Sequence, residues 1–149
     1  MEIIDIGYVK STFTRTGKYV HSGIGCLASV MRFFGVNPNI EELVKECGVD
    51  SGTISLHSIM EAAQYKGFRA DGYEGDINFL KEFVRPVILP GEKKEGYDYC
   101  FLLYGWQDNK FIIGDPQWGI VEYRENELDA FWKSKTFLLI RPAETIHDK

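Results

Sequence analysis

The first half of the chain places apolar residues three and four positions apart, which is the spacing of amphipathic helices. One such run starts at Cys26 and stops at Gly35. In the next run, Asn39 is a candidate N-terminal cap, and Glu41 and Glu42 suit a first helical turn. The helices predicted from this pattern are 26–34, 39–48 and a third from near Ser55 to Lys66-Gly67.

The second half changes to short apolar segments separated by turn residues. The nearly continuous apolar run 99–106 is typical of a central strand that is buried on both faces. Gln107-Asp108-Asn109 reverses the chain and makes 110–114 the hairpin partner of that strand. The strands predicted are 85–91, 99–106, 110–114, 120–123 and 136–140, with a short helix at 125–133. Helices followed by an antiparallel sheet predict an α+β fold, in one domain over residues 1–149.

The composition narrows the class of protein. The chain has 149 residues, of which 44% are hydrophobic, which is enough for a core and excludes intrinsic disorder. Its 17 Lys and Arg against 22 Asp and Glu give a net charge of −5. That balance argues against nucleic acid or an anionic membrane surface as the main partner.

The same sequence argues against export and membrane insertion. No apolar run approaches the ~18–20 residues of a membrane span, and residues 1–5 carry acids where a signal peptide is basic. Three cysteines, an odd number, favour a reducing compartment. We therefore expect a cytoplasmic domain.

The cysteines are the first candidates for chemistry. Cys26 directly follows Gly25 at the opening of a predicted helix, where the helix dipole stabilises a thiolate. The alternative is that Cys26 is simply buried, because free cysteine is among the most buried residue types. Cys47 and Cys100 are both predicted to be core residues.

Histidine is scarce, which limits the choice of a general base. The chain has His21, His57 and His147, and none of them lies in the sheet half. His21 is the histidine near Cys26 in sequence. The Cys and His spacings match no zinc motif, and the glycines match no phosphate-binding loop. We expect neither a metal nor another cofactor.

Asp115-Pro116 follows a predicted strand, and no other carboxylate in the chain has a position that points as specifically to a catalytic role. A carboxylate at a strand end could orient a catalytic side chain on the neighbouring strand. The simpler alternative is a turn at the exit of a hairpin.

Several ordered motifs together resemble peptidase family C39, the bacteriocin-processing peptidases of papain-like fold. The family signature Asp-Cys-Gly-x-Ala-Cys-Leu opens a helix that ends in an aromatic pair and glycine. A Pro-Val-Ile-Leu strand, a His-Phe-Val-Val strand and an Asp-Pro-x-x-Gly turn follow. The similar segments here are 21–27, 33–35, 86–89, 100–103 and 115–119. The resemblance extends over residues 16–142 and implies helices packed on a C-terminal antiparallel sheet.

The departures from the family pattern bear directly on function. The resemblance puts the nucleophilic Cys at Ser22, the base His at Cys100 and the oxyanion-hole Gln at Thr16, and only the orienting Asp115 is retained. A serine hydroxyl is a weak nucleophile without a base. The resemblance therefore predicts a catalytically degenerate domain. An active cysteine peptidase that uses Cys26 with His21 is the alternative.

A degenerate domain of this kind is expected to bind peptides rather than cleave them. Similar domains on haemolysin-type exporters hold the substrate, so the resemblance implies binding of leader or substrate peptides during peptide maturation and ABC-type export. We expect Tyr99, Trp106 and Trp118 to line the substrate channel near the former active site. Because no ATPase or membrane segment is recognisable in the sequence, a stand-alone domain that acts on an exporter in trans is expected.

Overall fold

The computed structural model describes residues 4–17, 20–47, 55–91 and 99–143. Its helices are α1 (Ile6–Thr12), α2 (Ser22–Phe33), α3 (Ile40–Cys47), α4 (Leu56–Tyr65), α5 (Ile77–Leu80) and α6 (Glu125–Phe131). Its strands are β1 (Phe68–Glu74), β2 (Val87–Gly91), β3 (Tyr99–Gln107), β4 (Lys110–Asp115), β5 (Gly119–Tyr123) and β6 (Thr136–Pro142). Over these ranges, no helix has both the length and the apolar character that a bilayer span requires.

The described strands form a six-stranded sheet in the order β1-β6-β2-β3-β4-β5. Each of these pairings is antiparallel, which confirms the predicted α+β class. β3 lies between β2 and β4 and is buried over most of its length, as predicted for the run 99–106. The predicted hairpin is also confirmed: Asp108 and Asn109 adopt φ values of 56° and 63°, a region that these residue types tolerate better than most.

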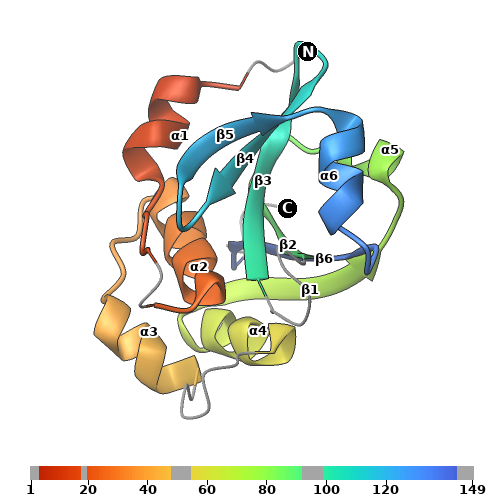
Figure 1. Ribbon diagram of the computed structural model, residues 1–149. Coiled ribbons are helices and arrows are strands. Elements are labelled where there is room, and N and C mark those ends of the chain that lie inside the picture. The colour runs from red at the N-terminus through yellow and green to blue at the C-terminus, as the bar shows by residue number, and fades with distance from the viewer. Residues whose placement is uncertain (1–3, 18–19, 48–54, 92–98, 144–149) are drawn as a thin grey trace.

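Side chains alternate along β3 between two cores, one on each face of the sheet. Cys100 and Tyr104 belong to the core that α1 to α4 cover, whereas Phe101 and Leu103 belong to the core that α5 and α6 cover. Figure 1 shows these two groups of helices on opposite sides of the sheet. Cys100 is therefore on the face that packs against α2.

The second and third predicted helices are confirmed, as is the predicted Asn39 cap, and the structure shows that Ser55 caps the third helix. The Asn39 Oδ1 atom accepts a hydrogen bond from the Glu42 N–H at 3.0 Å. The Ser55 Oγ atom accepts one from the Ser58 N–H at 3.1 Å. Both caps follow from side chains that satisfy a free N–H in the first helical turn.

The first predicted helix starts earlier than expected. α2 begins at Ser22 because His21 caps it, with its Nδ1 atom accepting a hydrogen bond from the Gly23 N–H at 2.9 Å. Histidine is not among the usual capping residues, so the pattern gave no sign of this start. The prediction that Cys26 opens a helix is therefore wrong, since Cys26 lies about one turn further in.

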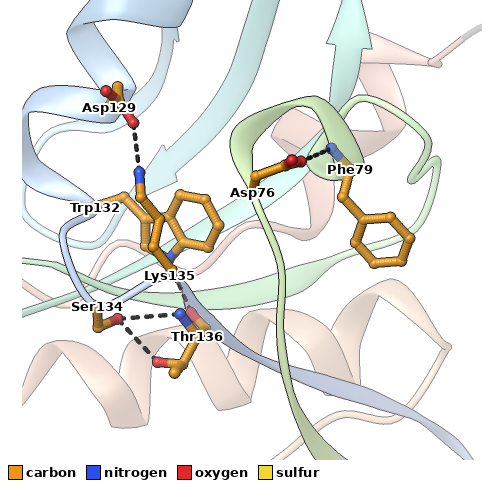
Figure 2. A network of polar contacts seen from close by, with 7 residues as sticks. All are labelled: Asp76, Phe79, Asp129, Trp132, Ser134, Lys135 and Thr136. Carbon is orange, nitrogen blue, oxygen red and sulfur yellow. Dashed lines mark hydrogen bonds and ion pairs between the residues drawn. The ribbon is translucent and has the colours of Figure 1, made fainter.

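α1, β1 and α5 have no counterpart in the prediction. β1 is an edge strand whose first residues are partly inward and whose last residues are exposed, so it lacks a clear alternation. It is held by β6, which is distant in sequence. α5 is a single turn capped by Asp76, whose carboxylate accepts a hydrogen bond from the Phe79 N–H at 2.9 Å (Figure 2).

Figure 2 shows how the chain leaves α6 and enters β6. The Trp132 Nε1–H donates to the Thr136 carbonyl at 2.8 Å. Lys135, with φ 59°, donates to the Asp129 carboxylate at 2.6 Å, and its Nζ atom lies 5.0 Å from the centroid of the Trp132 ring. These contacts stop the helix at Phe131, two residues before the predicted end at 133.

Candidate active site

Three elements that are far apart in sequence bring Ser22, Cys100 and Asp115 into one buried region. Ser22 is the first residue of α2, Cys100 lies at the start of β3, and Asp115 ends β4. Their exposed fractions are 6%, 5% and 1%. The backbone N–H of Cys100 donates a hydrogen bond to the Ser22 Oγ atom at 2.7 Å, so a hydroxyl oxygen at the helix N-terminus is engaged by a main-chain donor.

The segment that carries Thr16 covers this region. The backbone N–H groups of Thr16 and Gly17 both donate to the Pro116 carbonyl at 3.0 Å. A Cβ atom on Gly25 would lie 2.7 Å from the Thr16 Oγ1 atom, so the close approach of this segment to α2 requires glycine at that position. Among the described residues, the buried Thr16 hydroxyl has no hydrogen-bond partner. Thr16 therefore packs against the helix.

Asp115 holds a rigid turn through its Oδ1 atom. The Tyr99 hydroxyl donates to that oxygen at 2.5 Å, and the Gln117 N–H donates to it at 2.9 Å and also approaches the Tyr99 hydroxyl oxygen at 3.1 Å. Burial and the contact with Asp115 raise the pKa of Tyr99, so its phenol stays protonated and acts as a donor rather than as a base. The structure thus gives Asp115 a tyrosine partner, which sequence analysis missed.

The geometry argues against Cys26 as a nucleophile. Its side chain is completely buried in the core between α2 and the sheet. Burial raises the pKa of the Cys26 thiol well above its ordinary value, and the neighbouring Cys100 and Asp115 raise it further. The His21 Nδ1 atom already accepts the Gly23 N–H. A protonated, enclosed thiol of this kind is inert.

These raised pKa values predict that the fold is sensitive to alkali. Cys26, Tyr99 and Tyr104 all have pKa values raised mainly by burial. Above about pH 9 the unfolded chain releases these protons first, so the free energy of unfolding falls as the pH rises, and below that pH their contribution is fully present. Cys26 alone should account for a slope of up to about 1.4 kcal/mol per pH unit.

Urea unfolding at pH 7.5, 9 and 10.5 measures this slope, and the variant Cys26→Ala is its control. The variant should lose less stability between pH 9 and 10.5 than the unmodified chain does. Equal slopes for the two proteins would show that the Cys26 thiol does not titrate differently in the folded and unfolded states.

The predicted aromatic residues do not all lie at the site. Tyr99 does, and Trp118 follows the Asp115 turn with 61% of its surface exposed. Trp106 is six residues along β3 from Cys100, roughly 20 Å for an extended strand. It packs on Phe111 in the other core, and the Lys81 Nζ atom lies 4.6 Å from its ring centroid. The expectation that Trp106 lines the same channel therefore has no support in the fold.

The remaining cysteine and histidines lie away from this region. Cys47 is in the core at the end of α3, where burial raises its pKa to about 11. His57 pairs with Glu61 at 3.1 Å on an exposed helix face. His147 lies outside the described residues. Within the described ranges, no group of His, Cys, Asp and Glu has the arrangement of a metal site.

Comparison with known sequences identifies what this arrangement resembles. The model of the peptidase C39 family matches residues 10–145. LagD of Lactococcus lactis, a lactococcin-G-processing and transport ATP-binding protein, is 23% identical over 112 residues. That alignment covers 74% of this chain but only 16% of LagD, so the chain spans a small part of that relative.

Solved structures show the same fold. The peptidase domain of Streptococcus ComA, a bi-functional ABC transporter of a quorum-sensing pathway, matches with a TM-score of 0.80 and 22% identity over 87% of this chain and 96% of that one. A double-glycine-motif protease from an AMS/PCAT transporter, solved in complex with its leader peptide, matches with a TM-score of 0.73 and 23% identity over 89% and 96%. The predicted peptidase fold is confirmed.

Proposed function

Since the chain belongs to the peptidase C39 family, we propose that it is a member that has lost catalysis and binds leader or substrate peptides. The family relationship extends to the peptidase domains of peptide-exporting ABC transporters. The proposal adds that this domain holds a peptide without cleaving it, and that it serves peptide maturation and export in the cytoplasm with an exporter as its partner.

The contact between Ser22 and Cys100 carries this proposal. A cysteine peptidase needs a thiolate at the helix N-terminus and an imidazole that exchanges its proton. Here a hydroxyl occupies the first position and accepts a hydrogen bond from the Cys100 N–H. The side chain of Cys100 cannot replace the imidazole, because a thiol is not a base near neutral pH. Asp115 keeps the carboxylate of the family pattern, and its Oδ1 atom accepts the Tyr99 hydroxyl.

The turn after Asp115 supports peptide binding. Its backbone is held from three sides, by the Asp115 carboxylate, by the Arg15 Nε–H donating to the Gln117 carbonyl at 2.8 Å, and by Thr16 at Pro116. This rigid turn presents Trp118 at the surface. An aromatic side chain on a pre-organised loop is a typical anchor for a partner, because little conformational entropy is lost on binding. Since the PCAT protease is solved with its leader peptide, a peptide with a Gly-Gly leader is the natural candidate.

We expect such leader peptides to bind without being cleaved, and Trp118→Ala to weaken binding by about 10- to 30-fold, as loss of an aromatic anchor does. Fluorescence anisotropy of labelled leader peptides measures binding, and mass spectrometry after prolonged incubation measures cleavage. Tyr65→Ala is the matched control, because Tyr65 is exposed on α4 and distant from the Asp115 turn in sequence. It should leave the affinity unchanged.

The other outcomes are equally decisive. Cleavage that Cys26→Ala abolishes would establish the alternative, a cysteine peptidase with a displaced nucleophile, and would refute the proposal. Peptides that neither bind nor react would refute the leader-binding role while leaving family membership untouched. An equal loss of affinity in Trp118→Ala and Tyr65→Ala would remove Trp118 as an anchor.

A further inference from the structure

A cavity of about 540 Å³ opens at the end of β2 that is remote from the candidate active site. It is lined by residues that come just before Val87, and Val87 pairs with Leu103. Cys100 pairs with Pro90, near the other end of β2. The cavity is therefore separate from the region around Ser22 and is not explained by the proposed peptide-binding function.

A proline in the sequence accounts for this opening. β2 pairs with β6 at Ile88↔Leu138 and Val87↔Leu139, and the described pairing stops there. The preceding residue, Pro86, has no N–H to donate and so cannot extend the ladder. β6 continues to Pro142 alongside β1, which lies on its other side (Figure 1). The cavity lies between this last part of β6 and the segment 82–85, where further strand pairing would have been.

Most of the lining is apolar. It includes Phe34 at the end of α2, Phe83, Val84, Leu139 and Ile140. Val84 is one of the large apolar side chains that the fold leaves exposed. The volume is within the range of about 300–1,000 Å³ that is usual for small-molecule pockets. The size and lining suit the hydrocarbon part of a small ligand.

Two arginines stand in this apolar lining without a partner. Arg85 and Arg141 both line the cavity, and neither side chain makes a hydrogen bond or an ion pair with the residues that the structure describes. Arg141 is also directly opposite Arg69 in the β1–β6 register. Directly opposed like charges destabilise an antiparallel pair, so positive charge gathers at this end of the sheet.

Nearby acids limit the charge that the site can accept. Glu82 lines the same cavity, and Asp71 follows Arg69 by two residues on the same face of β1. Among the described residues that line the cavity, two arginines and one acid leave an excess of one positive charge. A group with a single negative charge matches this excess, whereas a doubly charged phosphate would be repelled by Glu82. Planar guanidinium groups also match the geometry of a carboxylate.

We propose that this cavity binds a small aliphatic carboxylate of the fatty-acid type. Its hydrocarbon chain lies between Phe34 and the apolar residues of β6, and its carboxylate is held by Arg85 and Arg141. Binding supplies a negative charge for the two arginines that line the cavity. This proposal does not depend on the peptide-binding role of the domain.

Decanoate, kept below its aggregation concentration, is the probe, and decanol is the matched ligand without the charge. Isothermal titration calorimetry should show decanoate binding at least ~10-fold more tightly than decanol, because hydrogen bonds to a charged group are the strong ones. Arg85→Gln and Arg141→Gln should each weaken decanoate binding by roughly 10-fold. Lys133→Gln, which removes the same charge from an exposed position after α6, should have no effect.

One further variant and one stability measurement separate binding from folding. Ala143→Trp fills the rim of the cavity from an exposed position and should weaken binding of both ligands. Arg141→Gln should not lower the thermal unfolding temperature, because it removes a like-charge pair with Arg69. Equal affinities for decanoate and decanol, or unchanged decanoate affinity in both arginine variants, would overturn the proposal.

Discussion

The double variant Ser22→Cys, Cys100→His is expected to cleave Gly-Gly leader peptides at a rate at least about 10²-fold above that of the unmodified chain, the lower end of what a positioned base contributes. Position 22 is the first residue of α2, where the helix dipole lowers the pKa of a thiol. Position 100 lies on the strand face that packs against this helix end, and its backbone already contacts the Ser22 side chain. A nucleophile and a base introduced there would be within reach of each other.

Tyr99 limits how far this restoration can go. The Asp115 Oδ1 atom, which should orient the introduced imidazole, accepts the Tyr99 hydroxyl at 2.5 Å. Adding Tyr99→Phe to the double variant is therefore expected to raise the cleavage rate further, because it removes one of the two hydrogen bonds that this oxygen accepts and leaves the one from the Gln117 N–H. The rate is measured by mass spectrometry of the leader peptide under single-turnover conditions.

The controls for this experiment use the same scaffold. Ser22→Ala with Cys100→His retains the introduced base but has no nucleophile, and should be inactive. Asp115→Asn in the double variant should lower the rate again. If the double variant folds and binds peptide but stays inactive even after Thr16→Gln restores the oxyanion-hole residue, the resemblance has assigned positions 22 and 100 to the wrong roles.

Trp132→Ala is expected to cost about 3–5 kcal/mol of unfolding free energy, which is the usual cost of emptying a large aromatic site in a core. Trp132 is fully buried in the core beneath α6. Its Nε1–H also satisfies the Thr136 carbonyl at the start of β6, so the variant loses a hydrogen bond as well as packing (Figure 2). For a domain of this length, such a loss removes a large part of the total stability of about 5–15 kcal/mol.

Trp118→Ala is the matched control for this measurement. It removes the same side chain from a position that is 61% exposed, and should change the free energy of unfolding by no more than about 0.5 kcal/mol. Urea unfolding followed by circular dichroism compares the two variants. A similar loss of unfolding free energy in both variants would mean that the core covered by α5 and α6 contributes little to the stability of the fold.

Local patterns were enough for the parts of the fold that depend on neighbours in sequence. Asn39 and Ser55 each cap a helix within three residues of themselves, and Asp108-Asn109 closes a hairpin between adjacent strands. The motif order also placed Ser22, Cys100 and Asp115 as one group, and the fold brings their three elements together. These features are local, or repeat a family pattern, and so they can be recognised without coordinates.

The positions of the aromatic side chains around the site depend instead on contacts between segments that are distant in sequence. Trp106 lies near the end of β3 and Trp118 lies in the turn after β4. Only Trp118 lies beside Asp115, because the strand direction carries Trp106 to the far end of β3. The partnership of Tyr99 with Asp115 depends on how β3 and β4 lie together, which neither segment encodes alone.

The candidate active site shows most clearly what comes from the sequence and what comes from the tertiary structure. The sequence by itself, through its resemblance to C39 peptidases, predicted a serine and a cysteine at the positions of the nucleophile and the base. Only the tertiary structure decided that Cys26 is enclosed and protonated and that Pro86 opens a cavity against β6. The physical reason is that residue identity sets which chemistry is possible, whereas burial and strand pairing between remote segments set the dielectric surroundings and the space in which that chemistry occurs.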